Sequence, residues 1–183
     1  HELHYYLRFY FLSMGIATAI GGLIGHGFYY AFQVPGFEIS PWKLPGWLTS
    51  MFSVALLERA IIVYAREHAH RRLGTIFSWL NIIELITFVA LTFTTLNFFF
   101  VELHSTYGIM IVTGTFSIIS YVKTKSKGSK LFVIAVAMAA VSALVYKLKI
   151  DIHLWFNHLD FSHVLMAIAA YIFYLGSREM INE

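Results

Sequence analysis

Hydrophobic residues come in long runs along this chain, and short polar segments separate the runs. A helix that crosses the hydrocarbon core of a bilayer needs about 20 mostly apolar residues. Runs of this kind predict six spans, at residues 7–30, 47–65, 75–96, 105–122, 131–146 and 161–176. The expected fold is therefore all-α, a polytopic transmembrane bundle of about six helices.

The polar segments between the predicted spans differ in charge, and this difference predicts an orientation. Basic residues concentrate between the second and third spans and between the fourth and fifth spans (Arg66, Arg71, Arg72; Lys123, Lys125, Lys127, Lys130). The alternate segments hold only Lys43, Lys147 and Lys149. Since positively charged loops stay on the cytoplasmic side, both termini are expected in the cytoplasm.

Composition supports a membrane protein and excludes some other classes. The 183 residues are 58% hydrophobic and only 13% charged, whereas a soluble domain carries roughly a quarter charged residues. The net charge of +3 belongs to the loops, so it does not indicate nucleic-acid binding. Cysteine is absent, which excludes disulfides, thiolate nucleophiles and cysteine-bound metals. A single domain over residues 1–183 is expected, because every apolar segment needs its neighbours.

The chain is thus expected to be surrounded by membrane lipids. Whether it also binds a protein partner or forms a homo-oligomer stays open, because lipid-facing and partner-facing apolar surfaces have the same composition.

Ionisable side chains at membrane depth are costly, so each one is a candidate for a functional site. The predicted orientation brings several of them toward the outer leaflet: His26, His104, His158, Asp160 and His163. Two further histidines, in the basic segment after the second span, are predicted to belong to a solvated surface patch (His68 and His70).

Helical spacing predicts which way these groups face. Gly15, Ala19, Gly22 and His26 follow a spacing of three or four, and stripes of small residues mark close helix contacts. Asn157, Asp160 and His163 share one face that continues through two alanines (Ala167 and Ala170), and His104 with Gly108 repeats the pattern. Three histidines are therefore predicted to point into the bundle at one depth.

Simpler interpretations remain for several of these residues. Asn157 and Asp160 also match a helix start, with an Asn N-cap and an acid in the first turn. His26 alone could hydrogen-bond a neighbouring helix. Glu58, in the middle of the second span, could pair with Arg59 or reach a site, and Glu84 could bond Asn81 or another helix.

Imidazoles with a carboxylate form a suitable ligand set for zinc, which lowers the pKa of a bound water to near 7. A further carboxylate, Asp160 or Glu58, would then shuttle the proton. Because lipids reach a site between helices sideways, a lipid amide or ester is the expected substrate.

Two segments carry a family resemblance. Residues 17–28 (ATAIGGLIGHGF) and 156–165 (FNHLDFSHVL) resemble the "GG…HG" and "FN…D…H" motifs of an uncharacterised six-helix bacterial membrane family. The resemblance implies an integral protein of the bacterial inner membrane, and no function follows from it.

More distantly, the layout is similar to the ceramidase and progestin/adipoQ receptor superfamily of membrane zinc hydrolases. That resemblance implies His26 and His163 as zinc ligands. The chain departs from the superfamily pattern, since Gly22 replaces a serine, Leu159 replaces the first histidine of His-x-x-x-His, and no aspartate follows His26 nearby.

The leading hypothesis is a zinc-dependent membrane hydrolase of a lipid amide or ester. His26 and His163 would bind the metal, with Asp160 and either His158 or His104 completing the site. One alternative is a haem-binding electron carrier, which would need histidine pairs facing each other across helices. Another is a non-catalytic accessory or binding subunit, whose polar residues only satisfy one another.

Overall fold

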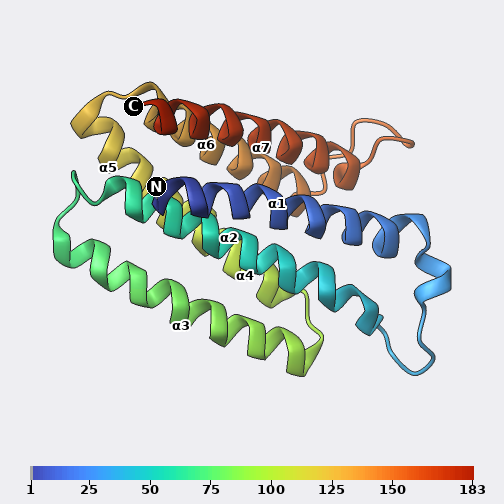
Figure 1. Cartoon of the computed structure of the whole chain (residues 1–183). Helices are drawn as coiled ribbons and strands as arrows, with labels where there is room; N and C mark the ends of the chain where they lie inside the picture. The colour runs from blue at the N-terminus through green and yellow to red at the C-terminus, as the bar shows by residue number, and fades with distance from the viewer. Residues whose placement is uncertain (1) are drawn as a thin grey trace.

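The computed structural model describes residues 2–183 and, within them, every side chain except those of His26 and Tyr29. The α-helices are α1 (Glu2–Gly22), α2 (Leu44–Ala65), α3 (Arg71–Thr95), α4 (Phe99–Thr106), α5 (Gly114–Thr124), α6 (Lys127–Lys147) and α7 (His158–Asn182) (Figure 1). A π-helical turn, η1 (Leu23–Gly27), continues α1, and a second one, η4 (Tyr107–Thr113), joins α4 to α5. Short 3₁₀ turns occupy η2 (Tyr29–Phe32) and η3 (Pro41–Lys43).

Six helical segments are long and apolar enough to span a membrane: Glu2–Gly25, Pro41–Ala65, Arg71–Thr95, Phe99–Thr124, Lys127–Lys147 and His158–Asn182. The predicted six-helix, all-α bundle is confirmed, because these segments contain the six apolar runs with longer ends. Two runs extend past their spans: the first, where the chain leaves the π-helical turn before the 3₁₀ turn η2, and the third by one residue, since Leu96 is the C-cap of α3.

Polar capping residues explain why the helices extend beyond the predicted apolar runs. Asn157 accepts hydrogen bonds from the backbone N–H groups of Leu159 and Asp160, and its own N–H donates to the Asp160 carboxylate. This capping box starts α7 at His158, as the alternative interpretation of Asn157 and Asp160 predicted. Ser126 caps α6 in a similar way through the N–H of Ser129.

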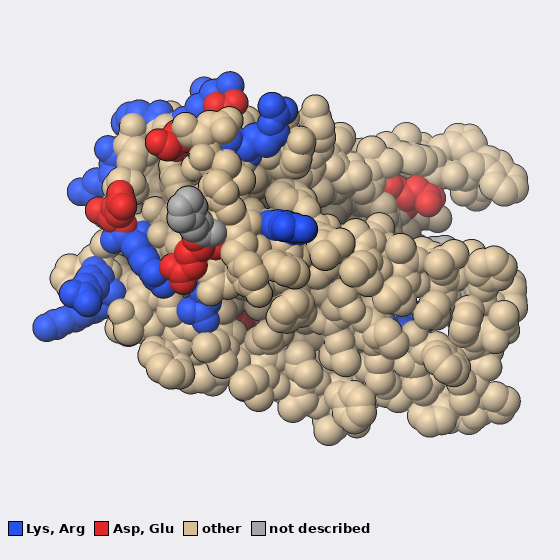
Figure 2. All heavy atoms as spheres, viewed as in Figure 1, with Lys and Arg blue, Asp and Glu red and all other residues tan. Residues whose placement is uncertain are grey.

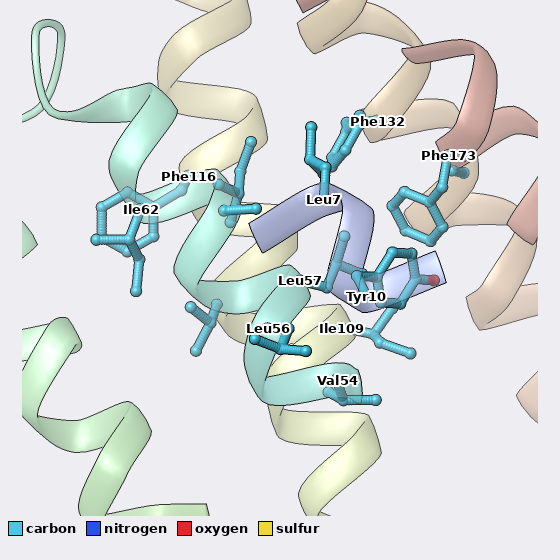
Figure 3. Close-up of a cluster of buried hydrophobic side chains, with 14 of the residues drawn as sticks. Leu7, Tyr10, Val54, Leu56, Leu57, Ile62, Ile109, Phe116, Phe132 and Phe173 are labelled. Carbon is cyan, nitrogen blue, oxygen red and sulfur yellow. The ribbon is translucent and has the colours of Figure 1, made fainter. Parts of the chain in front are cut away.

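α2 packs against α1, α3 and the fourth span, and it lies between α1 and α3 (Figure 1). α1 packs along α2, α6 packs along α7, and α3 lies on the outside against α2 and α4. Figure 3 shows the central apolar cluster, to which Leu57 of α2, Phe116 of α5, Phe132 of α6 and Phe173 of α7 contribute. Burial of such side chains removes apolar surface from contact with lipid and fixes the helix positions by close packing.

The outer surface of the bundle is apolar over its middle. On α3, Trp79, Ile83 and Ile86 are 64%, 57% and 63% exposed, because no described residue covers that face. Such a face suits a lipid environment, whereas it would be an aggregation hazard in water.

Charged residues gather at the end of the bundle that holds both termini (Figure 2). We call this end of the bundle the basic end. Two ion pairs link helices there, one from Arg66 to Glu2 at 2.9 Å and one from Lys127 to Glu179 at 2.8 Å. Both pairs are exposed, so their contribution to stability is small. The clustering matches the charge asymmetry on which the predicted cytoplasmic termini depend.

The orientation predicts a labelling pattern for single cysteines in this cysteine-free chain. Glu38→Cys lies in the loop at the opposite end and Glu67→Cys at the basic end, and both positions are exposed. In intact cells, a membrane-impermeant maleimide should label the first variant and should label the second only after the membrane is opened. The reverse pattern would show that the basic end faces outward.

The contact between α6 and α7 predicts a destabilising glycine substitution. A Cβ atom on Gly128 would lie 2.9 Å from the backbone nitrogen of Met180 and 3.1 Å from the carbonyl oxygen of Gly176. Gly128→Ala should therefore lower the free energy of unfolding by about 1–3 kcal/mol, the usual cost of overpacking. The matched control is Gly15→Ala, whose Cβ would meet nothing within 4 Å. Thermal unfolding in detergent should separate the two variants, and equal stability would contradict the close contact.

Candidate functional site

Three ionisable side chains from three different spans meet inside the bundle. They are Glu58 of α2, Glu84 of α3 and His104 of α4, and one ligand atom from each lies within 4.8 Å of the others. Glu58 and His104 are fully buried, and the Glu84 side chain is only 9% exposed. Among the described residues this is the one group that has the composition and geometry to hold a metal ion.

The imidazole of His104 has a defined role for each ring nitrogen. Its Nε2 lies 2.9 Å from the carbonyl oxygen of Met51, and because a carbonyl only accepts, Nε2–H is the donor. Its Nδ1 lies 2.5 Å from Oε1 of Glu84. The ring is thereby oriented with Nδ1 toward Glu84, and Phe88 packs beside it at 6.0 Å between ring centroids.

Glu58 is the unusual member of the cluster, because neither carboxylate oxygen has a hydrogen-bond partner in residues 2–183. Oε2 of Glu84 is also without one. Asn81, one turn before Glu84 on α3, donates instead to the carbonyl oxygen of Ala55 at 3.1 Å. A buried polar atom without a partner carries a desolvation cost that a bound ligand or water would relieve.

The neighbouring Arg59 does not neutralise Glu58 in the described part of the chain. Its guanidinium donates to the carbonyl oxygen of Ser78 on α3 at 2.8 Å, and no ion pair joins the two side chains. The alternative prediction of a Glu58–Arg59 pair is therefore wrong. The reason is helical geometry, since adjacent residues project about 100° apart around the axis.

The backbone of the fourth span makes room for Glu58. Gly108 is buried in the π-helical turn η4, and a Cβ atom there would lie 2.3 Å from Oε1 of Glu58 and 2.5 Å from Cγ1 of Val54. A side chain at this position would force Glu58 or Val54 to shift. π-Helical turns inside α-helices are frequent at functional sites, and this one lies directly after His104.

The cluster suits a divalent cation on grounds of charge and geometry. Two carboxylates and a neutral imidazole balance a doubly charged ion, whereas two bare carboxylates inside a membrane bundle would repel each other. Tetrahedral ligands of zinc lie about 3.4 Å apart, given metal–ligand distances of about 2.0–2.2 Å. Glu84 would thus have to move away from His104, so that the ion replaces the hydrogen bond between them.

Only part of the predicted ligand set belongs to this cluster. His104 and Glu58 were both predicted as site residues, and the fold brings them together. The side chain of His26 lies outside the described residues, and its backbone lies in η1.

The inward orientation predicted for His163 is wrong, because the side chain is exposed. Its Nδ1 lies 2.5 Å from the carbonyl oxygen of Leu159. The small stripe through Asp160 and His163 is not the packed face, because the buried positions of α7 are Ser162, Ala169, Phe173, Gly176, Ser177 and Met180.

Asp160 and His158 serve the local structure at the start of α7. Asp160 is exposed and completes the capping box. His158 binds Asp151 through Nδ1 at 2.8 Å and through its backbone N–H at 2.7 Å. These hydrogen bonds from His158 hold the pKa of Asp151 below its ordinary value. The two residues thus tie the 148–157 loop to the helix and do not join the buried cluster.

His70 is exposed and caps α3 by accepting the N–H of Arg72, in agreement with the predicted surface location. Of the two partners predicted for Glu84, Asn81 or another helix, the second is confirmed, because Glu84 bonds His104 of α4. Its depth matched that of a site, but no sequence signal showed that its helical face meets His104.

Fold and cluster together define a class, a six-helix bundle of the membrane-spanning type with a buried carboxylate–imidazole centre. The chain belongs to a family of unknown function (DUF6962), whose family model matches residues 1–182. No curated protein and no solved structure matches the chain. The likeness to the ceramidase superfamily therefore stays a hypothesis.

The contact between Gly108 and Glu58 predicts a coupled pair of substitutions. Gly108→Ala should lower the free energy of unfolding by about 1–3 kcal/mol, because the new methyl group displaces the Glu58 carboxylate. Glu58→Asp shortens the side chain, so adding it to Gly108→Ala should restore part of the lost stability. Chemical or thermal unfolding of the two single variants and the double variant measures this coupling. Strictly additive effects would contradict the contact.

Proposed function

We propose that this protein is a metal-dependent hydrolase of the membrane, with a divalent metal ion, preferentially zinc, bound by Glu58, Glu84 and Nδ1 of His104. The observation that carries the proposal is the buried Glu58 carboxylate, which lies without a hydrogen-bond partner in the described chain beside two further ligand groups. The proposal keeps the predicted chemistry and moves the metal from His26 and His163 to the buried cluster.

The hydrogen bond from His104 to Met51 supports metal binding. Histidines that bind metals usually donate their second N–H to a carbonyl or carboxylate, which fixes the ring and its tautomer. His104 has this arrangement, since Nε2–H is bound to the Met51 carbonyl and Nδ1 faces Glu58 and Glu84. Carboxylate and imidazole ligands also suit manganese and iron, so the identity of the metal is part of the test.

Three protein ligands would leave a fourth position on the metal for water, the arrangement of catalytic zinc sites. A water bound there is activated as a nucleophile near neutral pH. The slightly exposed Glu84 lies on the outermost helix, whose surface is apolar, so the approach from the bilayer is short. A lipid amide or ester is accordingly the proposed substrate, and the bacterial inner membrane the proposed location.

No specific observation favours either alternative function, the haem-binding electron carrier or the accessory subunit. His104 meets two carboxylates and no second histidine in the described cluster, whereas a haem carrier needs paired histidines. An accessory subunit would have polar groups that satisfy one another, whereas Glu58 and Oε2 of Glu84 have no partner in residues 2–183.

The proposal predicts a metal that depends on the cluster. Detergent-purified protein should contain about one divalent ion per chain, because three ligands of the type found in zinc sites converge there. Glu58→Gln, Glu84→Gln and His104→Ala should each lower the metal content strongly, as measured by mass spectrometry. His158→Ala and His163→Ala are matched controls with exposed or half-buried imidazoles, and both should keep the metal.

Three results would contradict this site. A folded protein that binds no added divalent metal excludes the metal centre, and loss of metal in His163→Ala alone moves the ligands to α7. Retained metal with no hydrolysis of lipid amides or esters would keep the centre and exclude the hydrolase.

A further inference from the structure

The loop between α6 and α7, residues 148–157, exposes large apolar side chains at the end of the bundle opposite the basic end (Figure 1). Its tip, Leu154 and Trp155, is 87% and 85% exposed, so almost nothing in the described chain packs on these two side chains. Three further apolar residues of the loop are also exposed (Leu148, Ile150 and Ile152). Single exposed apolar residues are ordinary, whereas several adjoining ones mark a surface that contacts something outside the chain.

Polar residues alternate with these apolar ones. The sequence from Lys147 to Leu154 reads KLKIDIHL, in which every second residue is charged or carries an imidazole. Such alternation produces an amphipathic segment, with one apolar and one polar side. In a soluble domain the apolar side would pack on the core, but here it stays exposed. The segment therefore fits a boundary between an apolar and an aqueous phase.

Hydrogen bonds give the loop a defined shape with the tip at its apex. The backbone N–H of His153 donates to the carbonyl oxygen of Phe156 at 3.2 Å, and the N–H of Phe156 donates to the carbonyl oxygen of His153 at 2.9 Å. The tip lies between these two residues. At the base of the loop, Asp151 accepts hydrogen bonds from His158 of α7. The polar residues thus close the loop and leave its apolar residues exposed.

The length of α6 places the loop at the membrane boundary. α6 has 21 residues, which at a rise of about 1.5 Å per residue gives a length of about 31 Å, close to the ~30 Å hydrocarbon core of a bilayer. Lysines close both ends of this helix, and each is ion-paired with a glutamate of another helix (Lys127 with Glu179, Lys147 with Glu102). The loop begins directly after Lys147 and ends where α7 starts, so it stays near the interface.

Lipid suits the exposed surface of the loop better than a protein partner does. Val141 and Leu144 of α6 are exposed, and Leu148 continues them at spacings of three and four, so the lipid-facing side of α6 runs on into the loop. A buried tryptophan covers about 150–250 Å². The tip therefore offers far less than the roughly 800 Å² that each partner contributes to a stable protein interface.

We propose that the tip inserts into the membrane interface at the end opposite the basic end, where the phospholipids of that leaflet surround Leu154 and Trp155. Tryptophan is enriched at this depth, because its ring is apolar and its N–H can bond to headgroups and water. Lys149 and Asp151, on the polar side of the segment, stay in water. The loop is thus an interfacial anchor for α6 and α7. The inference goes beyond the proposed hydrolase and needs neither a bound metal nor a particular orientation of the chain.

Spin labels test the depth of the tip, since the chain has no cysteine of its own. Leu154→Cys and Trp155→Cys are labelled with a nitroxide in vesicles of phosphatidylethanolamine and phosphatidylglycerol. Collisions of each label with oxygen, which concentrates in lipid, and with a water-soluble nickel complex are then measured. The matched controls are Ile83→Cys on the exposed apolar side of α3 and Glu38→Cys in the exposed loop at the same end as the tip.

Both tip labels should have an oxygen-to-nickel collision ratio at least about tenfold above that of Glu38→Cys, which corresponds to about 1.4 kcal/mol in partition free energy. A ratio equal to that of Glu38→Cys would put the tip in water and overturn the proposal. Rare collisions with both reagents, together with dipolar broadening between labels, would assign the tip to a contact with a second copy and overturn it as well.

A second pair of variants tests whether the tip itself holds the loop in the membrane. With the label at Ile152→Cys, the double change Leu154→Asp and Trp155→Asp should lower the ratio to that of Glu38→Cys, because aspartate is costly in lipid. The matched control, Leu154→Phe with Trp155→Leu, keeps the tip apolar and should leave the ratio unchanged. If the aspartate variant also left it unchanged, the tip would not be an anchor.

Discussion

The burial of Glu58 in the middle of a mostly apolar bundle is the constraint to which the surrounding helices conform. A carboxylate at membrane depth is tolerated only inside the bundle and near groups that compensate its charge. α2 therefore lies centrally, with α3 and α4 bringing Glu84 and His104 toward it. The fourth span supplies a glycine and a π-helical turn at the point of contact, because a regular helix with a side chain there would collide with the carboxylate.

The same constraint separates the bundle into two functional parts. α6 and α7 pack through close glycine contacts, and the buried Ser142 of α6 donates to the carbonyl oxygen of Ser162 on α7. In the described chain, α2, α3 and the fourth span hold the buried side-chain oxygens that have no hydrogen-bond partner, which belong to Glu58, Glu84, Thr113, Ser117 and Ser120. Rigid packing on one side thus positions a hydrophilic arrangement on the other. In the proposed function the cluster binds the metal.

Much of the candidate site escaped prediction for a geometric reason. His104 and Glu58 could be selected from depth alone, because an ionisable residue within an apolar run is visible in sequence. The faces of the helices could not be assigned in the same way. The alanine stripe through Asp160 and His163 suggested an inward face. α7 instead packs through a face that includes Ser162, which is adjacent to His163 and therefore projects about 100° away from it around the helix axis. Small residues line both packed and exposed faces here, so their spacing did not discriminate.

The sequence by itself determined the six spans, the basic end and the capping box of α7, because hydrophobic length, charge distribution and local hydrogen bonding act over neighbouring residues. Tertiary structure alone decided which polar groups meet. Glu58 and Glu84 lie on spans that neighbour each other in sequence. His104 joins them because of the orientation of α4 about its own axis, which the local sequence does not determine. That orientation depends on side-chain packing between helices, where apolar surfaces of equal composition face lipid and protein alike.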